Sequence, residues 1–174
     1  MATREPFPIP RGLAIALAAA GPVAAGAILA VRARDARPML AAPVIVFGVV
    51  AATGPALYIA SAAVGHAPPL AAVVRAFGVA LGAFGIALAG LLLPAAFIAV
   101  SSVTAGTTIA ASSGAIAIAG YLGLRRLATE LRPPGGVSDG VAALASSAVF
   151  LVWAGATVAI AGRLWWDLAV EVVS

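Results

Sequence analysis

The longest stretch without a charged residue runs from Ala76 to Leu124 and contains forty-nine residues. As a single α-helix it would extend about 73 Å, at roughly 1.5 Å per residue. The hydrocarbon core of a bilayer is only about 30 Å thick. If the run lies in lipid it must therefore cross twice, and we expect a helical hairpin that turns near Ser101 and Ser102.

The composition indicates that the uncharged run lies in a lipid bilayer. The chain is 63% hydrophobic and 9% charged, with a mean hydropathy of +1.14, whereas a soluble domain is about 45 to 50% apolar and about 25% charged. A soluble fold of 174 residues could not bury this much apolar surface. The sequence therefore predicts an integral membrane protein whose first partner is the lipid bilayer, and we interpret the net charge of +4 as helix anchoring, with no nucleic-acid partner.

Apolar runs of about 20 residues predict five membrane spans, and the alternation of a barrel strand is absent. The expected fold is all-α: a polytopic transmembrane helical bundle of about five spans, forming one integral membrane domain over 1–174 with no soluble domain. We expect the first run to be a retained helix, because it is longer than the 7 to 15 residues typical of a signal-peptide core. The runs are Gly12 to Val31, Met39 to Val64, Val74 to Val100, Val103 to Leu124 and Gly140 to Gly162.

Arginines at the ends of these runs predict the orientation. Five spans would collect six of the ten arginines on one side of the membrane, which predicts a cytoplasmic N-terminus. Arg75 lies about one turn inside the third run. We expect its long side chain to reach the interface; the alternative is a functional charge within the membrane.

Small residues are spaced for close helix packing. Gly78 and Gly82 form a GxxxG pair and Gly85 continues the pattern, which marks a candidate helix-packing or partner face. The partner helix is either in this chain, in another subunit or in a second copy.

Gly54 and Pro55 interrupt the second run, and this is either a kink absorbed by neighbours or a discontinuous helix that coordinates an ion.

Hydroxyl side chains recur every four residues in the fourth run, at Thr104, Thr108 and Ser112. We expect them to bond to their own helix or to a neighbouring helix. In the alternative, they join Arg75 as the polar path of a small transporter or channel subunit. His66 is the only histidine, so it cannot build a zinc site, and ligation of a haem or pigment in a larger complex is left open.

The C-terminal stretch "GRLWWDLAVEVVS" predicts an amphipathic tail, 163–174, that continues the fifth helix. A polar stripe along it is formed by Arg163, Asp167 and Glu171, and Trp165 and Trp166 lie at the membrane junction. The tail is either an interfacial anchor or a docking surface for a partner.

Chemistry-bearing residues are scarce. No paired carboxylates, catalytic triad or phosphate loop occurs within the spans, and the absence of cysteine excludes disulfides and thiolate sites. We therefore expect no enzymatic activity, no catalytic residue, no metal and no cofactor. The preferred hypothesis is an interaction or accessory subunit, bound to other membrane subunits or to itself, in the bacterial cytoplasmic membrane.

The arrangement of the spans resembles that of the small bacterial polytopic membrane proteins of the Yip1-like group. The likeness is carried by a second run ending near "GPALYIA", a third containing "LLLPAAF" and a fourth ending "GYLGLRRL". It implies a cytosolic N-terminus and a role in membrane organisation or trafficking interactions. The long soluble N-terminal region of better-known members has no counterpart here, and no functional residue is carried over.

Overall fold

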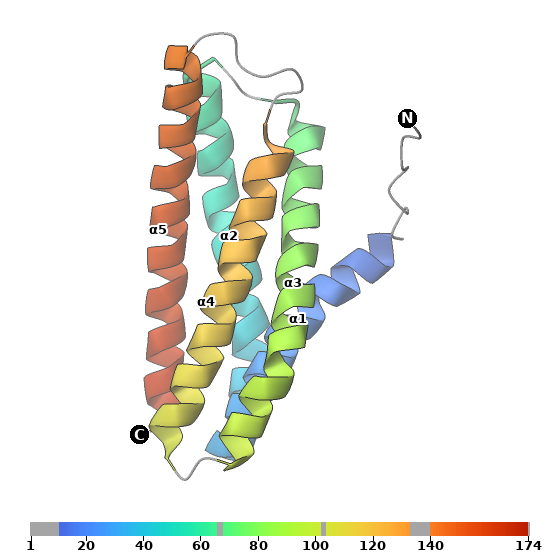
Figure 1. The fold of residues 1–174 in the computed structure, drawn as a ribbon, viewed down its shortest axis with the longest axis vertical. Helices are drawn as coiled ribbons and strands as arrows, with labels where there is room; N and C mark the ends of the chain where they lie inside the picture. Colours follow the sequence, from blue (N-terminus) through green and yellow to red (C-terminus); the bar gives the residue numbers. More distant parts are fainter. Residues whose placement is uncertain (1–10, 66–67, 102–103, 133–139, 174) are drawn as a thin grey trace.

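The structure, a computed structural model, describes residues 11–65, 68–101, 104–132 and 140–173. Every regular element within these ranges is an α-helix (Figure 1). The predicted hairpin turn is confirmed, because one helix ends at Ser101 and the next begins at Ala105. His66 lies outside the described residues. The helices are α1 (Arg11–Ala33), α2 (Arg37–Ala63), α3 (Leu70–Ser101), α4 (Ala105–Glu130) and α5 (Gly140–Val173).

Four of these helices, α2 to α5, are long and apolar enough to cross a membrane. The shortest, α4, has 26 residues and is about 39 Å long, which exceeds a hydrocarbon core of about 30 Å. The predicted all-α polytopic bundle is therefore confirmed. Helix α1 has 23 residues, and the apolar stretch identified among its described side chains is the shorter Ala18–Val31. A membrane crossing by α1 stays a prediction.

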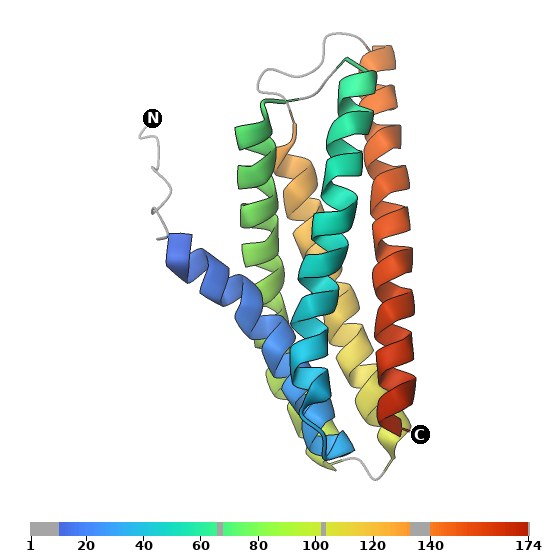
Figure 2. The same cartoon turned by 180° about the vertical axis from the view of Figure 1, so that it is seen from behind.

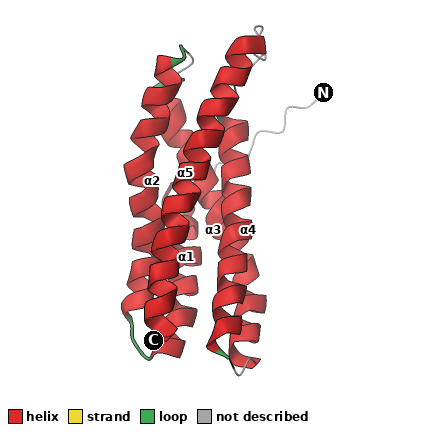
Figure 3. Ribbon diagram, turned by 90° about the vertical axis from the view of Figure 1, so that its left-hand side faces the viewer, coloured by secondary structure: helices red, strands yellow, loops and turns green. Residues whose placement is uncertain are grey.

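The bundle is built from two closely packed helix pairs and one bridging helix. Helix α3 packs along α4, and α2 packs along α5, while α1 contacts both α2 and α3. Figure 3 shows the α3–α4 pair beside the α2–α5 pair. Helix α1 is oblique: its C-terminal half lies against the bundle, and its first turns lean away from it (Figures 1 and 2). It therefore covers only the end of the bundle where α2 begins and α3 ends.

The interior is made of small and aliphatic side chains. Ala25 of α1, Leu88 of α3 and Ala119 of α4 are buried in one cluster, and Leu127 is buried in a second cluster with Trp153. Because lipid tails are as apolar as leucine, close packing of backbones supplies much of the association energy. Alanine at the contacts permits that close approach.

Two helices extend well beyond the predicted spans. Helix α4 continues six residues past Leu124, and α5 continues past Gly162 to Val173, which confirms that the C-terminal stretch continues the fifth helix. An apolar run measures the length of helix in contact with lipid, and charged residues do not end a helix. Ion pairs one turn apart stabilise both extensions: Arg126 with Glu130 at 2.7 Å, and Arg163 with Asp167 at 3.2 Å.

Prolines inside the helices are tolerated. Helix α2 is continuous from Arg37 to Ala63 through both Pro43 and Pro55, so the discontinuous-helix alternative for the Gly54–Pro55 step is not found. A side chain of a neighbouring helix packs at this point, since a Cβ added at Gly54 would lie 3.7 Å from the ring of Phe77 of α3.

A tight turn joins α1 to α2. Arg34 has a left-handed backbone, with φ of 54°. The amide of Asp35 donates to the carbonyl of Ala30 at 3.2 Å, and the Asp35 carboxylate accepts from the amide of Arg37 at 3.1 Å. These bonds satisfy groups that the two helix ends leave free, and they fix α1 against the start of α2.

Candidate functional site

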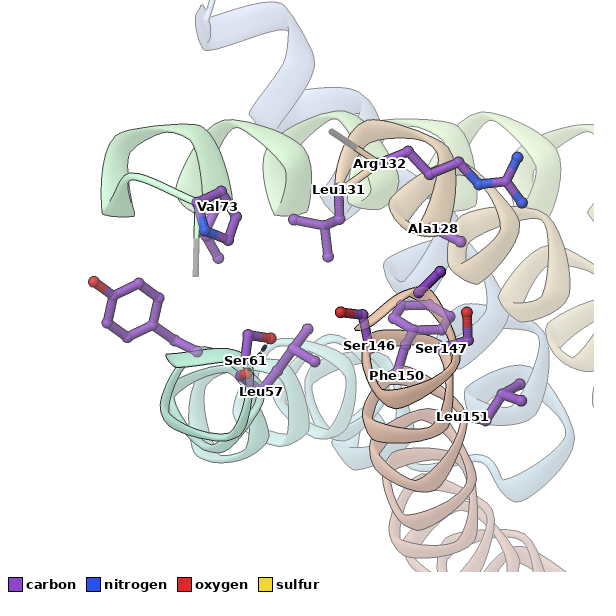
Figure 4. Close-up of a pocket in the computed structure, with 13 residues that line it drawn as sticks. Leu57, Ser61, Val73, Ala128, Leu131, Arg132, Ser146, Ser147, Phe150 and Leu151 are labelled. Atoms are coloured by element: carbon purple, nitrogen blue, oxygen red, sulfur yellow. Dashed lines mark hydrogen bonds between the residues drawn. The ribbon is translucent and has the colours of Figure 1, made fainter. Parts of the chain in front are cut away.

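A cavity of about 650 Å³ lies at the end of the bundle that α1 does not cover. It is formed where α2 and α4 end and where α3 and α5 begin (Figure 4). At this end the two helix pairs have no fifth helix between them, so the space between the pairs is only partly filled. Four helices thus contribute to one concave surface.

The walls of the cavity are mainly apolar. Leu57 of α2, Leu131 at the end of α4 and Phe150 of α5 face the space. Leu151 also lines it and is 68% exposed, so the cavity is continuous with the outer, lipid-facing surface of α5. An amphipathic molecule entering between the helices would meet hydrocarbon surface first.

Polar groups are few and come from three parts of the wall: Tyr58 and Ser61 of α2, Arg132 after α4, and Ser146 and Ser147 of α5. Ser61 of α2 uses its hydroxyl to donate to the carbonyl of Leu57 at 2.8 Å. The Oγ of Ser146 is enclosed and has no hydrogen-bond partner among the described residues. Ser147 and the exposed Arg132 line the same cavity (Figure 4). The enclosed hydroxyl has hydrogen-bonding capacity left for a bound molecule.

An aromatic cluster closes the cavity toward the interior. Phe150, which lines the cavity, has its ring centroid 5.9 Å from that of Trp153. Phe77 of α3 meets Trp153 edge to face, at 5.8 Å. The indole N–H of Trp153 donates to the backbone carbonyl of Thr53 at 2.7 Å, which ties α5 to α2. The cluster therefore holds the two helix pairs together below the cavity.

Positive charge gathers at the same end. Among the described residues this end carries four arginines, Arg75, Arg125, Arg126 and Arg132, and one carboxylate, Glu130. Glu130 pairs with Arg126. At the opposite end Arg37 pairs with Asp35 at 3.7 Å, and Arg163 pairs with Asp167. The opposite end carries as many arginines among the described residues, Arg32, Arg34, Arg37 and Arg163, but three carboxylates, so the net positive charge is larger on the cavity side.

The residues of the predicted polar path are spread along the length of the bundle. Arg75 is exposed near the start of α3, whereas Thr104 precedes α4 at the other end of the bundle. Thr108 and Ser112 are buried, at 1% and 0% exposure, and Ser112 Oγ has no partner among the described residues. None of these four residues lines the cavity.

Close helix crossings involve Gly85 of the predicted face and two glycines of α1 that were not predicted. A Cβ on Gly21 of α1 would lie 2.8 Å from the carbonyl oxygen of Gly85, so these two helices touch backbone to backbone. Gly26 of α1 lies equally close to the start of α2. Gly85 is buried by this crossing, but a Cβ on Gly78 or Gly82 would meet nothing within 4 Å. Gly78 and Gly82 form an open glycine face, because the turns of α1 that precede Gly21 lean away from α3.

The C-terminal segment belongs to the bundle. Trp165 is 9% exposed and packs in a cluster with Leu29 of α1 and Ala42 of α2. Its indole N–H donates to the hydroxyl of Ser113 on α4 at 2.9 Å. Trp166 is 57% exposed, and Asp167 and Glu171 are exposed as well. The outer face of this segment is therefore available to a membrane interface, while its inner face joins three other helices.

Sequence reasoning missed the cavity residues. Ser61, Ser146 and Ser147 were indistinguishable from other serines in the spans, and Arg132 was grouped with the anchoring arginines. The available signal was their shared position at one end of the bundle: Ser61 lies near the C-terminus of α2, Arg132 follows the C-terminus of α4, and Ser146 and Ser147 lie near the N-terminus of α5.

Comparison of the chain with protein-family models, with curated proteins and with solved structures found no match. Among the described residues, no three histidine, aspartate or glutamate side chains gather into a group that could hold a metal ion. The surfaces from which a function can be argued are the cavity, the open glycine face and the outer face of the C-terminal segment.

Proposed function

We propose that the protein is a non-enzymatic integral membrane protein of the bacterial cytoplasmic membrane that acts as an interaction or accessory subunit. The observation that carries this proposal is the open glycine face at Gly78 and Gly82. Both glycines lie within a membrane-length helix and have no neighbour within 4 Å of a would-be Cβ. A second helix can approach such a surface to backbone distance.

The surroundings of this face favour a protein partner over lipid alone. The same helix already uses Gly85, one turn further on, for a backbone contact with Gly21 of α1. A helix from another subunit, or from a second copy, would continue that contact along α3 where α1 has turned away. The Yip1-like resemblance supports the same class of function.

If α1 also crosses the membrane, the N-terminus lies at the cavity end, and Arg4 and Arg11 bring the arginines at that end to six against four at the opposite end. This asymmetry supports a cytoplasmic position for the cavity end, because cytoplasmic loops are enriched in basic residues. Labelling of single cysteines introduced at Arg132 and at Asp35 tests this orientation, since the chain has no native cysteine. Labelling of both from one side of the membrane would contradict it.

The test of the interaction role is purification of the native complex from membranes. Gly82→Leu should release a stoichiometric partner or convert an oligomer to a monomer, because the added side chain fills the proposed contact. Gly48→Leu is the matched control: this glycine is exposed on α2 and also has no neighbour within 4 Å. Absence of any partner or self-association in the wild type would refute the role, and a Gly82→Leu protein that retains its partner would refute the face.

A small transporter or channel subunit is the second candidate. The enclosed hydroxyls of Ser112 and Thr157, which lack partners among the described residues, favour it. Transport would need a continuous polar path, and Arg75 lies at the opposite end of the bundle from Thr104. Arg75→Gln should therefore leave expression and assembly unchanged. Loss of a measured flux in a folded Arg75→Gln protein would favour transport.

A further inference from the structure

We propose that the cavity at the end of the bundle that α1 does not cover binds an anionic glycerophospholipid from the surrounding leaflet. One acyl chain would lie between Leu57, Leu131 and Phe150, and the headgroup would bind Arg132 with the hydroxyls of Ser146 and Ser147. This inference is independent of the interaction role, because none of these residues belongs to the open glycine face.

The size and walls of the cavity fit an acyl chain. Its volume of about 650 Å³ falls within the range of about 300 to 1,000 Å³ found for small-molecule sites. The cavity is continuous with the outer surface through Leu151, and Leu144 on the same helix is 72% exposed. In a bilayer these outer side chains contact hydrocarbon, so the molecules that meet the opening are lipids.

Charge selects the headgroup. Arg126 is already paired with Glu130, and Arg132 makes no ion pair among the described residues. Arg132 lies just beyond the end of α4, a position that corresponds to headgroup depth if the preceding apolar turns lie in the hydrocarbon. A guanidinium binds a phosphate through charge-assisted hydrogen bonds, and basic pockets between transmembrane helices are typical sites for anionic headgroups.

The enclosed hydroxyl gives a second reason for a polar ligand. Ser146 Oγ is shielded from solvent and has no partner among the described residues, although it lines the cavity beside Ser147. A phosphate or ester oxygen would accept its hydrogen bond. A purely hydrocarbon occupant would leave the hydroxyl unsatisfied.

The experiment titrates the purified full-length protein, in a nonionic detergent, with short-chain phosphatidylglycerol and with phosphatidylcholine of equal chain length. Binding is measured from the shift of the thermal unfolding midpoint. We expect phosphatidylglycerol to bind about tenfold more tightly. Arg132→Gln should remove that preference, and the matched control Arg125→Gln should keep it, because Arg125 is exposed on the same helix and does not line the cavity.

A cavity-filling variant tests the position of the chain. Ala128 lines the cavity, so Ala128→Phe should weaken binding of both lipids; Ala128→Leu replaces it if the larger side chain prevents folding. Equal binding of the two lipids, equal effects of Arg132→Gln and Arg125→Gln, or wild-type affinity in the filled variant would each overturn the proposal.

Discussion

Gly26 sets how closely α1 approaches α2, and its replacement by alanine is the sharpest test of the packing. A Cβ at this position would lie 2.7 Å from the Cα of Met39 and 2.9 Å from the carbonyl carbon of Pro38, and closer still to the Pro38 oxygen. Carbon atoms pack best at about 3.5 to 4.0 Å. The added methyl is therefore short of room by about 0.8 Å against Met39, and every atom that it meets is backbone.

Two opposing effects determine how much Gly26→Ala changes the free energy of unfolding. Alanine is favoured over glycine inside a helix by about 0.5 to 1 kcal/mol. Overpacking a tight site costs about 1 to 3 kcal/mol, and the upper part of that range applies here because α1 or the start of α2 must move as a backbone unit. The turn at Arg34 and Asp35 restricts that movement. We expect Gly26→Ala to lower the free energy of unfolding by about 2 kcal/mol.

The measurement is reversible unfolding in mixed micelles, followed by tryptophan fluorescence. Gly48→Ala is the control, because a Cβ there would meet nothing within 4 Å and only the helix-propensity term remains. The control should equal or exceed the wild type in stability. If Gly26→Ala is as stable as Gly48→Ala, the close α1–α2 contact does not exist as described.

Three further predictions test two hydrogen bonds and one strained backbone position. Trp153→Phe removes the hydrogen bond to the Thr53 carbonyl and should cost about 1 kcal/mol or more in the same unfolding assay; an unchanged stability would contradict the tie between α5 and α2. Trp165→Phe and Ser113→Ala should each cost about 0.5 to 1.5 kcal/mol, and the double variant should cost less than their sum because they share one bond; strict additivity would contradict that bond. Arg34→Gly should stabilise by about 0.5 kcal/mol, since relief of a left-handed penalty of about 1 to 2 kcal/mol exceeds the entropy of glycine; destabilisation would show that its side chain contributes more than the strain.

The helical hairpin and the all-α class were predictable because they depend on a single quantity, the length of apolar sequence relative to bilayer thickness. The turn between Ser101 and Ala105 follows from that length. Helix ends were less predictable. Arg125 and Arg126 mark the end of an apolar run, but the α4 helix continues to Glu130 because backbone hydrogen bonds do not depend on side-chain polarity.

The cavity could not be predicted, because its lining comes from residues as far apart in the sequence as Leu57 and Leu151. It also depends on the tilt of α1, which leaves that end of the bundle uncovered. Hydropathy predicts that α1 is a membrane-spanning helix, but it does not predict the angle between α1 and the other helices. Burial of the C-terminal segment escaped prediction for a related reason: a tryptophan pair next to charges is typical of an interface, yet Trp165 is directed inward to Ser113 while Trp166 faces out.

The glycine motif shows why spacing alone was insufficient in this chain. With 19 glycines in the sequence, a GxxxG pair arises easily: of the predicted face only Gly85 meets another backbone, and the close contacts at Gly21 and Gly26 of α1 were not predicted. What distinguishes these glycines is the path of α1, whose first turns lean away from the bundle and which then meets α3 at Gly21 and α2 at Gly26 (Figure 2). The same oblique path leaves Gly78 and Gly82 open on α3 and leaves the far end of the bundle without a covering helix. One geometric cause therefore produces both the proposed partner face and the proposed lipid cavity.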